Sequence, residues 1–136
     1  MNIVILYVAT AVIFLALDAI GLRFLIRPVF EQYIGGLLLE SPRLLPAAVF
    51  YLFYVAGLLW FVSLPALRAE QALLSVFFAG AFFGALAYGT YEFTNIATLQ
   101  GWSWRMLITD LIWGAVLTGT CAAAGVAITR ALMPAS

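Results

Sequence analysis

Four apolar runs occupy almost all of this 136-residue sequence, and they limit the folds open to the chain more than any other feature does. The runs extend over about residues 3–26, 44–67, 72–99 and 106–132. Each is at least as long as the ~20 residues that an α-helix needs to cross the ~30 Å hydrocarbon core of a bilayer. Because backbone polar groups must be satisfied within each segment in lipid, the sequence predicts four transmembrane helices.

Composition also indicates a membrane environment. Hydrophobic residues make up 66% of the chain, charged residues 9%, and the mean hydropathy is +1.13, whereas soluble domains are roughly half apolar and about one quarter charged. The six acidic and six basic residues cancel and lysine is absent, so we expect the lipid bilayer, and no nucleic acid, as partner. The lack of histidine and the single Cys121 argue against a zinc site, a histidine-ligated haem or an internal disulfide. We predict no metal site, and the sequence identifies no cofactor.

Short connections determine how the predicted helices are arranged. Residues 68–71 and 100–105 are too few to let neighbouring helices run in the same direction, so these neighbours must form antiparallel hairpins. The first run lacks a basic start and exceeds the ~7–15 apolar residues of a cleavable signal, so we expect it to be retained. The predicted fold class is all-α, an up-and-down bundle of four transmembrane helices that forms one integral membrane domain over residues 1–136.

The connection over residues 27–43 is the only one long enough to hold structure of its own. Its apolar side chains recur at helical spacing and are opposed by polar ones: Phe30, Tyr33, Ile34, Leu37 and Leu38 against Glu31, Gln32 and Glu40. This pattern predicts an amphipathic segment that lies in the membrane interface. Because Gly35 and Gly36 weaken a continuous helix, we expect a short helix with a break at that point.

Three carboxylic residues inside the apolar runs are the most informative for function. Asp18 lies late in the first run, Glu92 late in the third and Asp110 early in the fourth. At ~1.5 Å per residue, an up-and-down arrangement places all three roughly 6–12 Å inside the same membrane interface. Other candidate ligand-binding residues lie near this level or share a helix face with these carboxyl groups: Tyr51, Tyr54, Tyr88, Tyr91, Asn95 and Trp113.

Helical periodicity predicts that these residues face the interior of the bundle. Three sets share a helix face: Gly84, Tyr88, Glu92 and Asn95; Asp110, Trp113, Gly114, Leu117 and Cys121; and Tyr7, Ala11, Phe14, Asp18 and Gly21. A carboxylate exposed to lipid costs on the order of several kcal/mol, so these faces should point inward.

Simpler interpretations of the same residues stay open. Asp110 could be a hydrated residue in the first turns of its helix, close to Arg105. Asp18 could pair with Arg23 or with a buried hydroxyl, so that the polar cluster only fixes the register of the helices. The spacing of Gly80 and Gly84 favours close packing within the bundle over dimerisation, although homo-oligomerisation is a second interpretation.

The residues that carry these patterns also resemble a known family. Residues 50–57 (FYLFYVAG), 88–95 (YGTYEFTN) and 109–114 (TDLIWG), together with Leu17-Asp18-Ala19, are similar to Domain of Unknown Function family 2177. The resemblance covers essentially the full length and implies a multi-pass protein of the bacterial cytoplasmic membrane, with no assigned activity. Two positions depart from the family pattern: Glu92 replaces a usual Asp, and Gly21 replaces a usual Trp.

Three classes of function fit these observations. In the first, the cluster of carboxyl groups and tyrosines binds or transports a small ion or an amphiphile, and transport would require access from both faces. In the second, the protein is a membrane enzyme that acts on a lipid, with Glu92 or Asp18 as general acid or base. In the third, it is an accessory or scaffold subunit. The first class is our preferred hypothesis.

The distribution of arginines predicts the orientation in the membrane. Arg27, Arg43 and Arg105 lie on the face that carries residues 27–43 and 100–105, which we call the loop-rich face, whereas Arg68 and Arg130 lie on the other. Because cytoplasmic loops carry an excess of basic residues, we expect the loop-rich face to be cytoplasmic. A phosphatase that is active only outside the cytoplasm should then be active when fused after Ser136 and inactive when inserted at Gly36. The reverse pattern would contradict the orientation.

Overall fold

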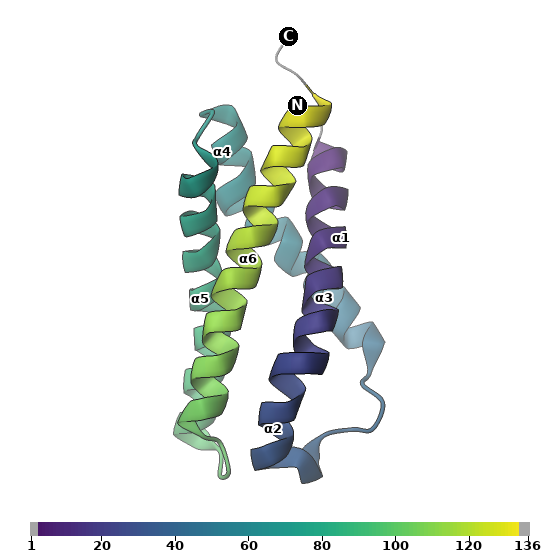
Figure 1. Ribbon diagram of the computed structural model, residues 1–136, viewed down its shortest axis with the longest axis vertical. Coiled ribbons are helices and arrows are strands. Elements are labelled where there is room, and N and C mark those ends of the chain that lie inside the picture. The colour runs from purple at the N-terminus through teal and green to yellow at the C-terminus, as the bar shows by residue number, and fades with distance from the viewer. Residues whose placement is uncertain (1–2, 134–136) are drawn as a thin grey trace.

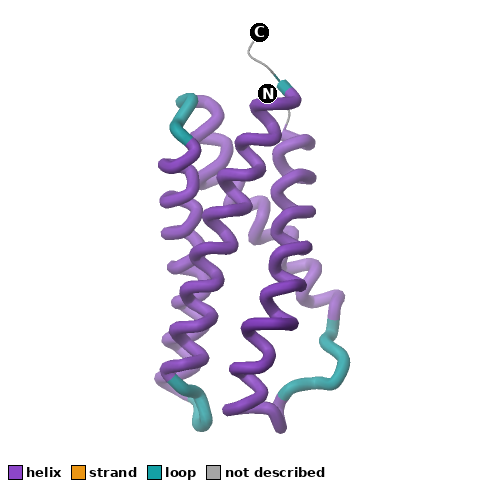
Figure 2. The backbone as a smooth tube through the Cα atoms, in the orientation of Figure 1, coloured by secondary structure: helices purple, strands orange, loops and turns teal. Residues whose placement is uncertain are grey.

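The computed structural model describes residues 3–133 as a bundle of helices (Figure 1), and this part of the chain contains no strand (Figure 2). Four helical spans are long and apolar enough to cross a membrane: Ile3–Leu37, Leu44–Arg68, Leu73–Thr98 and Trp104–Leu132. Successive spans run in opposite directions along the long axis. The predicted all-α bundle of four transmembrane helices is therefore confirmed.

The first span is longer than the sequence pattern predicts. Helix α1 (Ile3–Gly21) passes through a π-helical turn (Leu22–Ile26) into α2 (Arg27–Ile34), and a 3₁₀ turn (Gly35–Leu37) follows. Pro28 explains the π turn: proline has no N–H to donate and its ring crowds the carbonyl four residues earlier, and the widened turn accommodates both effects. The helix therefore does not end near residue 26 to be followed by a separate segment. It continues along the bundle axis (Figure 1). The expected break at the two glycines is present, and an interfacial position for this segment stays a prediction.

The second span is built in the same way. Helix α3 (Leu44–Leu58) leads through a π-helical turn (Leu59–Ser63) into α4 (Leu64–Arg68), and Pro65 is the second residue of α4. The N–H of Leu64 reaches the carbonyl of Leu59, five residues earlier, as that of Arg27 reaches Leu22 in the first span. Proline inside an apolar run thus changes the helix locally without ending it.

The third and fourth spans are uninterrupted helices, α5 (Leu73–Thr98) and α6 (Trp104–Leu132). Helix α6 begins two residues before the predicted start at residue 106. The reason is Ser103, whose hydroxyl accepts a hydrogen bond of 3.2 Å from the backbone N–H of Met106 and so caps the helix.

Helix α6 is the centre of the bundle, and its most extensive contact is with α5. Gly84 faces the backbone carbonyl of Gly114 and the side chain of Thr118, and a Cβ at Gly84 would overlap these atoms. Gly80 lies against Gly119 and Ala122 in the same way. The small residues therefore serve packing between helices of one chain, as the sequence favours.

The second span does not run beside the other three spans along their whole length. Helix α3 begins some way above the lower end, where α2 and the α5–α6 turn lie, and runs obliquely behind the bundle (Figures 1 and 2). At the opposite end, Leu58, Val62 and Val126 belong to one tightly packed apolar core. There the guanidinium of Arg130 donates hydrogen bonds to the carbonyls of Ala66 (3.4 Å) and Gln71 (2.7 Å). The bundle is therefore filled at one end and widened at the other.

The close contact at Gly84 leads to a stability prediction. Gly84→Ala should lower the free energy of unfolding by about 1–3 kcal/mol, because the added methyl group must push α5 away from α6. Gly36→Ala is the matched control, since a Cβ there meets nothing within 4 Å. Thermal unfolding of both variants in detergent checks the difference, and equal stability would contradict the close packing of α5 on α6.

Candidate functional site

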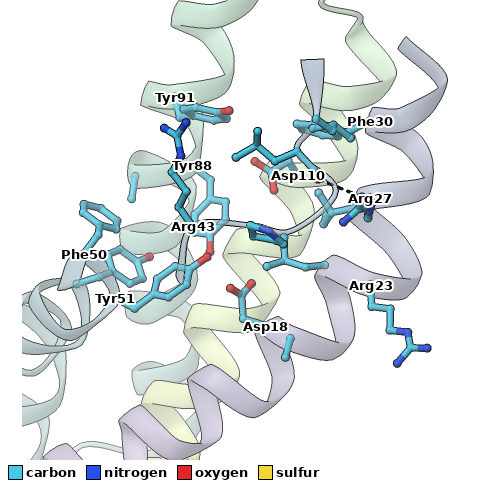
Figure 3. A pocket seen from close by; sticks show the side chains of 18 of the residues that line it. Asp18, Arg23, Arg27, Phe30, Arg43, Phe50, Tyr51, Tyr88, Tyr91 and Asp110 are labelled. Atoms are coloured by element: carbon cyan, nitrogen blue, oxygen red, sulfur yellow. Dashed lines mark hydrogen bonds between the residues drawn. The ribbon is translucent and has the colours of Figure 1, made fainter. Parts of the chain in front are cut away.

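A cavity of about 1110 Å³ occupies the widened end of the bundle. Its walls come from α1, the π turn after it, α2, α3, α5 and α6, and the connector over residues 38–43 crosses it (Figure 3). The wall is mainly apolar, with contributions from Leu22, Ile26, Phe30, Leu37 and Phe50. Carboxyl, hydroxyl and guanidinium groups interrupt this apolar surface.

Asp18 is the most deeply buried charged side chain on the cavity wall. Only 3% of its surface is exposed, and its Oδ1 accepts a long hydrogen bond of 3.4 Å from the indole Nε1 of Trp113. Gly21, one turn further along α1, leaves space for this indole ring, which a Cβ would overlap. The hydroxyl of Tyr51 points toward Asp18 (Figure 3). This hydroxyl interacts with the Asp18 carboxyl group, and within residues 3–133 Oδ2 itself forms no hydrogen bond.

Asp110 and Glu92 form a second carboxyl pair beside the cavity. Asp110 is 7% exposed and lines the cavity wall, whereas Glu92 is fully buried behind it. The two carboxyl groups face each other across the contact between α5 and α6. Oε1 of Glu92 accepts a hydrogen bond of 2.9 Å from Nε1 of Trp102, and in the described chain no donor reaches its Oε2.

The tyrosines form the wall opposite Asp18 and Asp110 (Figure 3). The Tyr54 hydroxyl shares a hydrogen bond of 2.9 Å with Thr118 Oγ1. The rings of Tyr51 and Tyr54 both pack on Phe14, with centroids 5.4 Å away in each case. The Tyr88 ring lies directly over Gly114, which has no Cβ to obstruct it. The packing of the tyrosine rings on neighbouring helices therefore holds this wall in place, together with the hydrogen bond of the Tyr54 hydroxyl.

The structure brings most of the candidate residues to this cavity: Asp18, Tyr51, Tyr54, Tyr88, Tyr91 and Asp110 line it. Glu92 and Trp113 do not line it but contact those that do, Glu92 through Asp110 and Trp113 through Asp18. Asn95 lies one turn beyond Tyr91, interacts with that residue and does not reach the cavity.

Three arginines on the wall were not among the candidate residues. Arg27 is engaged, because its guanidinium pairs with Glu31 Oε1 at 2.7 Å and donates to the carbonyl of Leu39 at 3.3 Å. Arg23 lies over the ring of Phe24 and points away from the cavity (Figure 3). Arg43 points from the connector toward Tyr91. The signal in the sequence was Arg43, an arginine directly before an apolar run. The distribution of arginines predicted only the orientation of the chain in the membrane.

Trp102 was also missed as part of the site. Trp102 lies in the short α5–α6 turn, and its indole N–H donates a hydrogen bond to Glu92. A buried indole N–H usually finds an acceptor. Glu92, ten residues earlier in the sequence, is a carboxyl group that could meet this need. This signal could have identified the pair of Trp102 and Glu92.

The contacts exclude two of the simpler interpretations of the acidic residues. Arg105 donates to Gln32 Oε1 at 3.1 Å, and Asp110 is buried, so Asp110 is not a hydrated partner of Arg105. Asp18 forms no ion pair with Arg23 among the described residues, whereas its contact with the Tyr51 hydroxyl leaves the pairing with a buried hydroxyl open. Within residues 3–133, no three carboxyl or thiol side chains lie close enough together to hold a metal ion.

Comparison with known proteins gives one match. A family model described as "Predicted membrane protein (DUF2177)" matches residues 3–127. No curated protein and no solved structure matches the chain.

The bond between Trp102 and Glu92 leads to a testable expectation. Trp102→Phe should destabilise the protein by about 1–3 kcal/mol, because it leaves Oε1 of a buried carboxyl group without a donor. Trp104→Phe is the control, since Trp104 is exposed. In a Glu92→Met background the cost of Trp102→Phe should largely disappear. Equal losses of unfolding temperature in both backgrounds would show that the bond contributes nothing.

Proposed function

The chain belongs to the DUF2177 family of predicted membrane proteins, and we propose that it binds a lipid-like amphiphile in the cavity at the widened end of the bundle. The polar end of the ligand donates hydrogen bonds to Asp18, and its alkyl chain lies against the apolar wall. A protein of this kind resides in the bacterial cytoplasmic membrane and takes its ligand from the surrounding leaflet.

The buried carboxyl group of Asp18 is the observation that carries this proposal. A polar atom that is buried without a partner costs about 1–3 kcal/mol, more if it is charged. Within residues 3–133 Asp18 Oδ2 forms no hydrogen bond, although the Tyr51 hydroxyl interacts with the same carboxyl group, and Asp18 lies on the wall of a large cavity. A ligand with a hydrogen-bond donor, above all a cationic one, removes that cost.

Size and lining favour an amphiphile over a small ion. The cavity of about 1110 Å³ slightly exceeds the roughly 300–1,000 Å³ that is usual for small-molecule sites. Leu22, Ile26 and Phe50 offer an apolar surface that a hydrated ion would not contact favourably.

Glu92 has a different role in this proposal. It is shielded from the cavity and bonded to Trp102, so it holds the α5–α6 turn and positions Asp110 rather than touching the ligand. The register-fixing role considered for the whole acidic cluster thus applies to Glu92, whereas Asp18 contacts the ligand. The lining residues include no serine or cysteine, so a covalent mechanism on a lipid has no nucleophile of these types at the cavity.

Long-chain amines test the proposal directly. Delipidated protein in detergent should bind hexadecylamine, measured by native mass spectrometry, and bind hexadecanoic acid much more weakly. Asp18→Asn should weaken hexadecylamine binding about ten-fold or more, because the charge that assists the hydrogen bond is lost. Its unfolding temperature should stay close to that of the parent.

The matched control is Glu70→Gln, since Glu70 lies in the α4–α5 turn, at the other end of the bundle. This variant should bind hexadecylamine as the parent does. The proposal is wrong if Asp18→Asn unfolds many degrees lower while its hexadecylamine affinity is unchanged. That result would assign Asp18 to helix packing alone.

A further inference from the structure

We propose that the head group of the ligand carries a phosphate beside its amine, so that the ligand class is an aminophospholipid. This inference rests on the proposed function. Arg43 binds the phosphate near the loop-rich face, and Asp18 binds the ammonium deeper in the leaflet.

Arg43 has a guanidinium that is free to bind an anion. It is the residue before α3, lines the cavity and is exposed. Among residues 3–133 it has no carboxylate within ion-pair distance and makes no side-chain hydrogen bond. Its side chain points across the cavity toward Tyr91 of α5 (Figure 3). A guanidinium offers a planar set of donors that matches two oxygens of one phosphate.

The other two arginines on the wall are less suited to this role. Arg27 already uses its guanidinium on Glu31 and on the backbone of the connector at Leu39. Arg23 stacks on Phe24 and points away from the cavity. Arg27 instead holds the connector close to α2, and this contact keeps the segment that ends at Arg43 in front of the cavity.

Asp18 and Arg43 therefore occupy different levels of one cavity. Asp18 lies at the inner level, while the guanidinium of Arg43 is directed toward the level of Tyr91, nearer the loop-rich face (Figure 3). A ligand with only an amine would leave Arg43 unpaired, and a purely anionic lipid would face the carboxyl groups of Asp18 and Asp110. A zwitterionic head group with an N–H donor offers a partner to each residue. Its phosphate can bind Arg43, and its ammonium group, joined to the phosphate by a short carbon chain, can bind Asp18.

The acyl chains of such a lipid also have an apolar surface to contact. The glycerol and acyl chains are attached to the phosphate, which this arrangement puts beside the connector. Leu37, Leu38 and Phe50 lie on that side of the cavity. In a membrane the open side of the widened end faces the acyl chains of the same leaflet, so the lipid tails need not be fully enclosed.

The test compares head groups on identical acyl chains. Native mass spectrometry of the delipidated full chain measures binding of dioleoyl phosphatidylethanolamine, phosphatidylglycerol and phosphatidylcholine, with hexadecylamine as the ligand that lacks phosphate. Phosphatidylethanolamine should bind about ten-fold or more tightly than phosphatidylglycerol, which has no cation for Asp18. Phosphatidylcholine should also bind more weakly, because its quaternary ammonium has no N–H to donate.

Variants separate the two ends of the head group. Arg43→Gln should weaken phosphatidylethanolamine binding about ten-fold and leave hexadecylamine binding unchanged. The control Arg68→Gln, at the opposite end of the bundle, should change neither. This inference is overturned if phosphatidylglycerol and phosphatidylethanolamine bind equally well. It is also overturned if Arg43→Gln weakens hexadecylamine binding as much as phosphatidylethanolamine binding. Loss of the Asp18 dependence of hexadecylamine binding would instead overturn the proposed function itself.

Discussion

The close approach of α5 and α6 is the contact on which the rest of the molecule depends. Because glycine at positions 84 and 114 removes the side chains between the two backbones, the helices touch along most of their length. That contact brings Glu92 of one helix against Asp110 of the other, and it leaves room for Tyr88 to lie flat over α6. Without a strong hydrophobic driving force between helices in lipid, such close packing is a main source of stability.

The two prolines that follow π-helical turns also influence the shape of the bundle. Pro28 and Pro65 each follow a π-helical turn, where the extra residue rotates the chain that comes after it. In the first span the turn lies between Asp18 and Phe30, so it sets which side chains of α2 reach the same cavity as those of α1. The oblique path of α3 then leaves this end of the bundle wider than the other (Figure 1).

The helices and the level of the acidic residues could be predicted because lipid imposes strict rules on both. An apolar run of sufficient length must be helical, and a carboxyl group within it must face inward, so Asp18, Glu92 and Asp110 were found from spacing alone. Their individual surroundings could not be predicted in this way. Whether a buried carboxyl group lines a cavity, as Asp18 does, or lies behind one, as Glu92 does, depends on the offset between neighbouring helices.

Other features escaped the sequence patterns for different physical reasons. Periodicity does not distinguish a proline that ends a helix from one that a π turn accommodates, so the continuation of the first span into α2 was missed. The role of Arg43 depends on the path of a connector that has no regular structure, and a pattern of residue types does not encode such a path. The hydrogen bond of Trp102 was missed because its acceptor, Glu92, belongs to another element.

The filled end of the bundle has a consequence for the exchange of any bound molecule. Arg130 fastens the end of α6 to the carbonyls of Ala66 and Gln71, and the packed core around Leu58 and Val126 lies between that end and the cavity. If Asp18 holds a lipid as proposed, this packed core separates that lipid from the opposite leaflet. The lipid would then enter and leave through the leaflet at the loop-rich face, and the protein would exchange lipids with that leaflet alone.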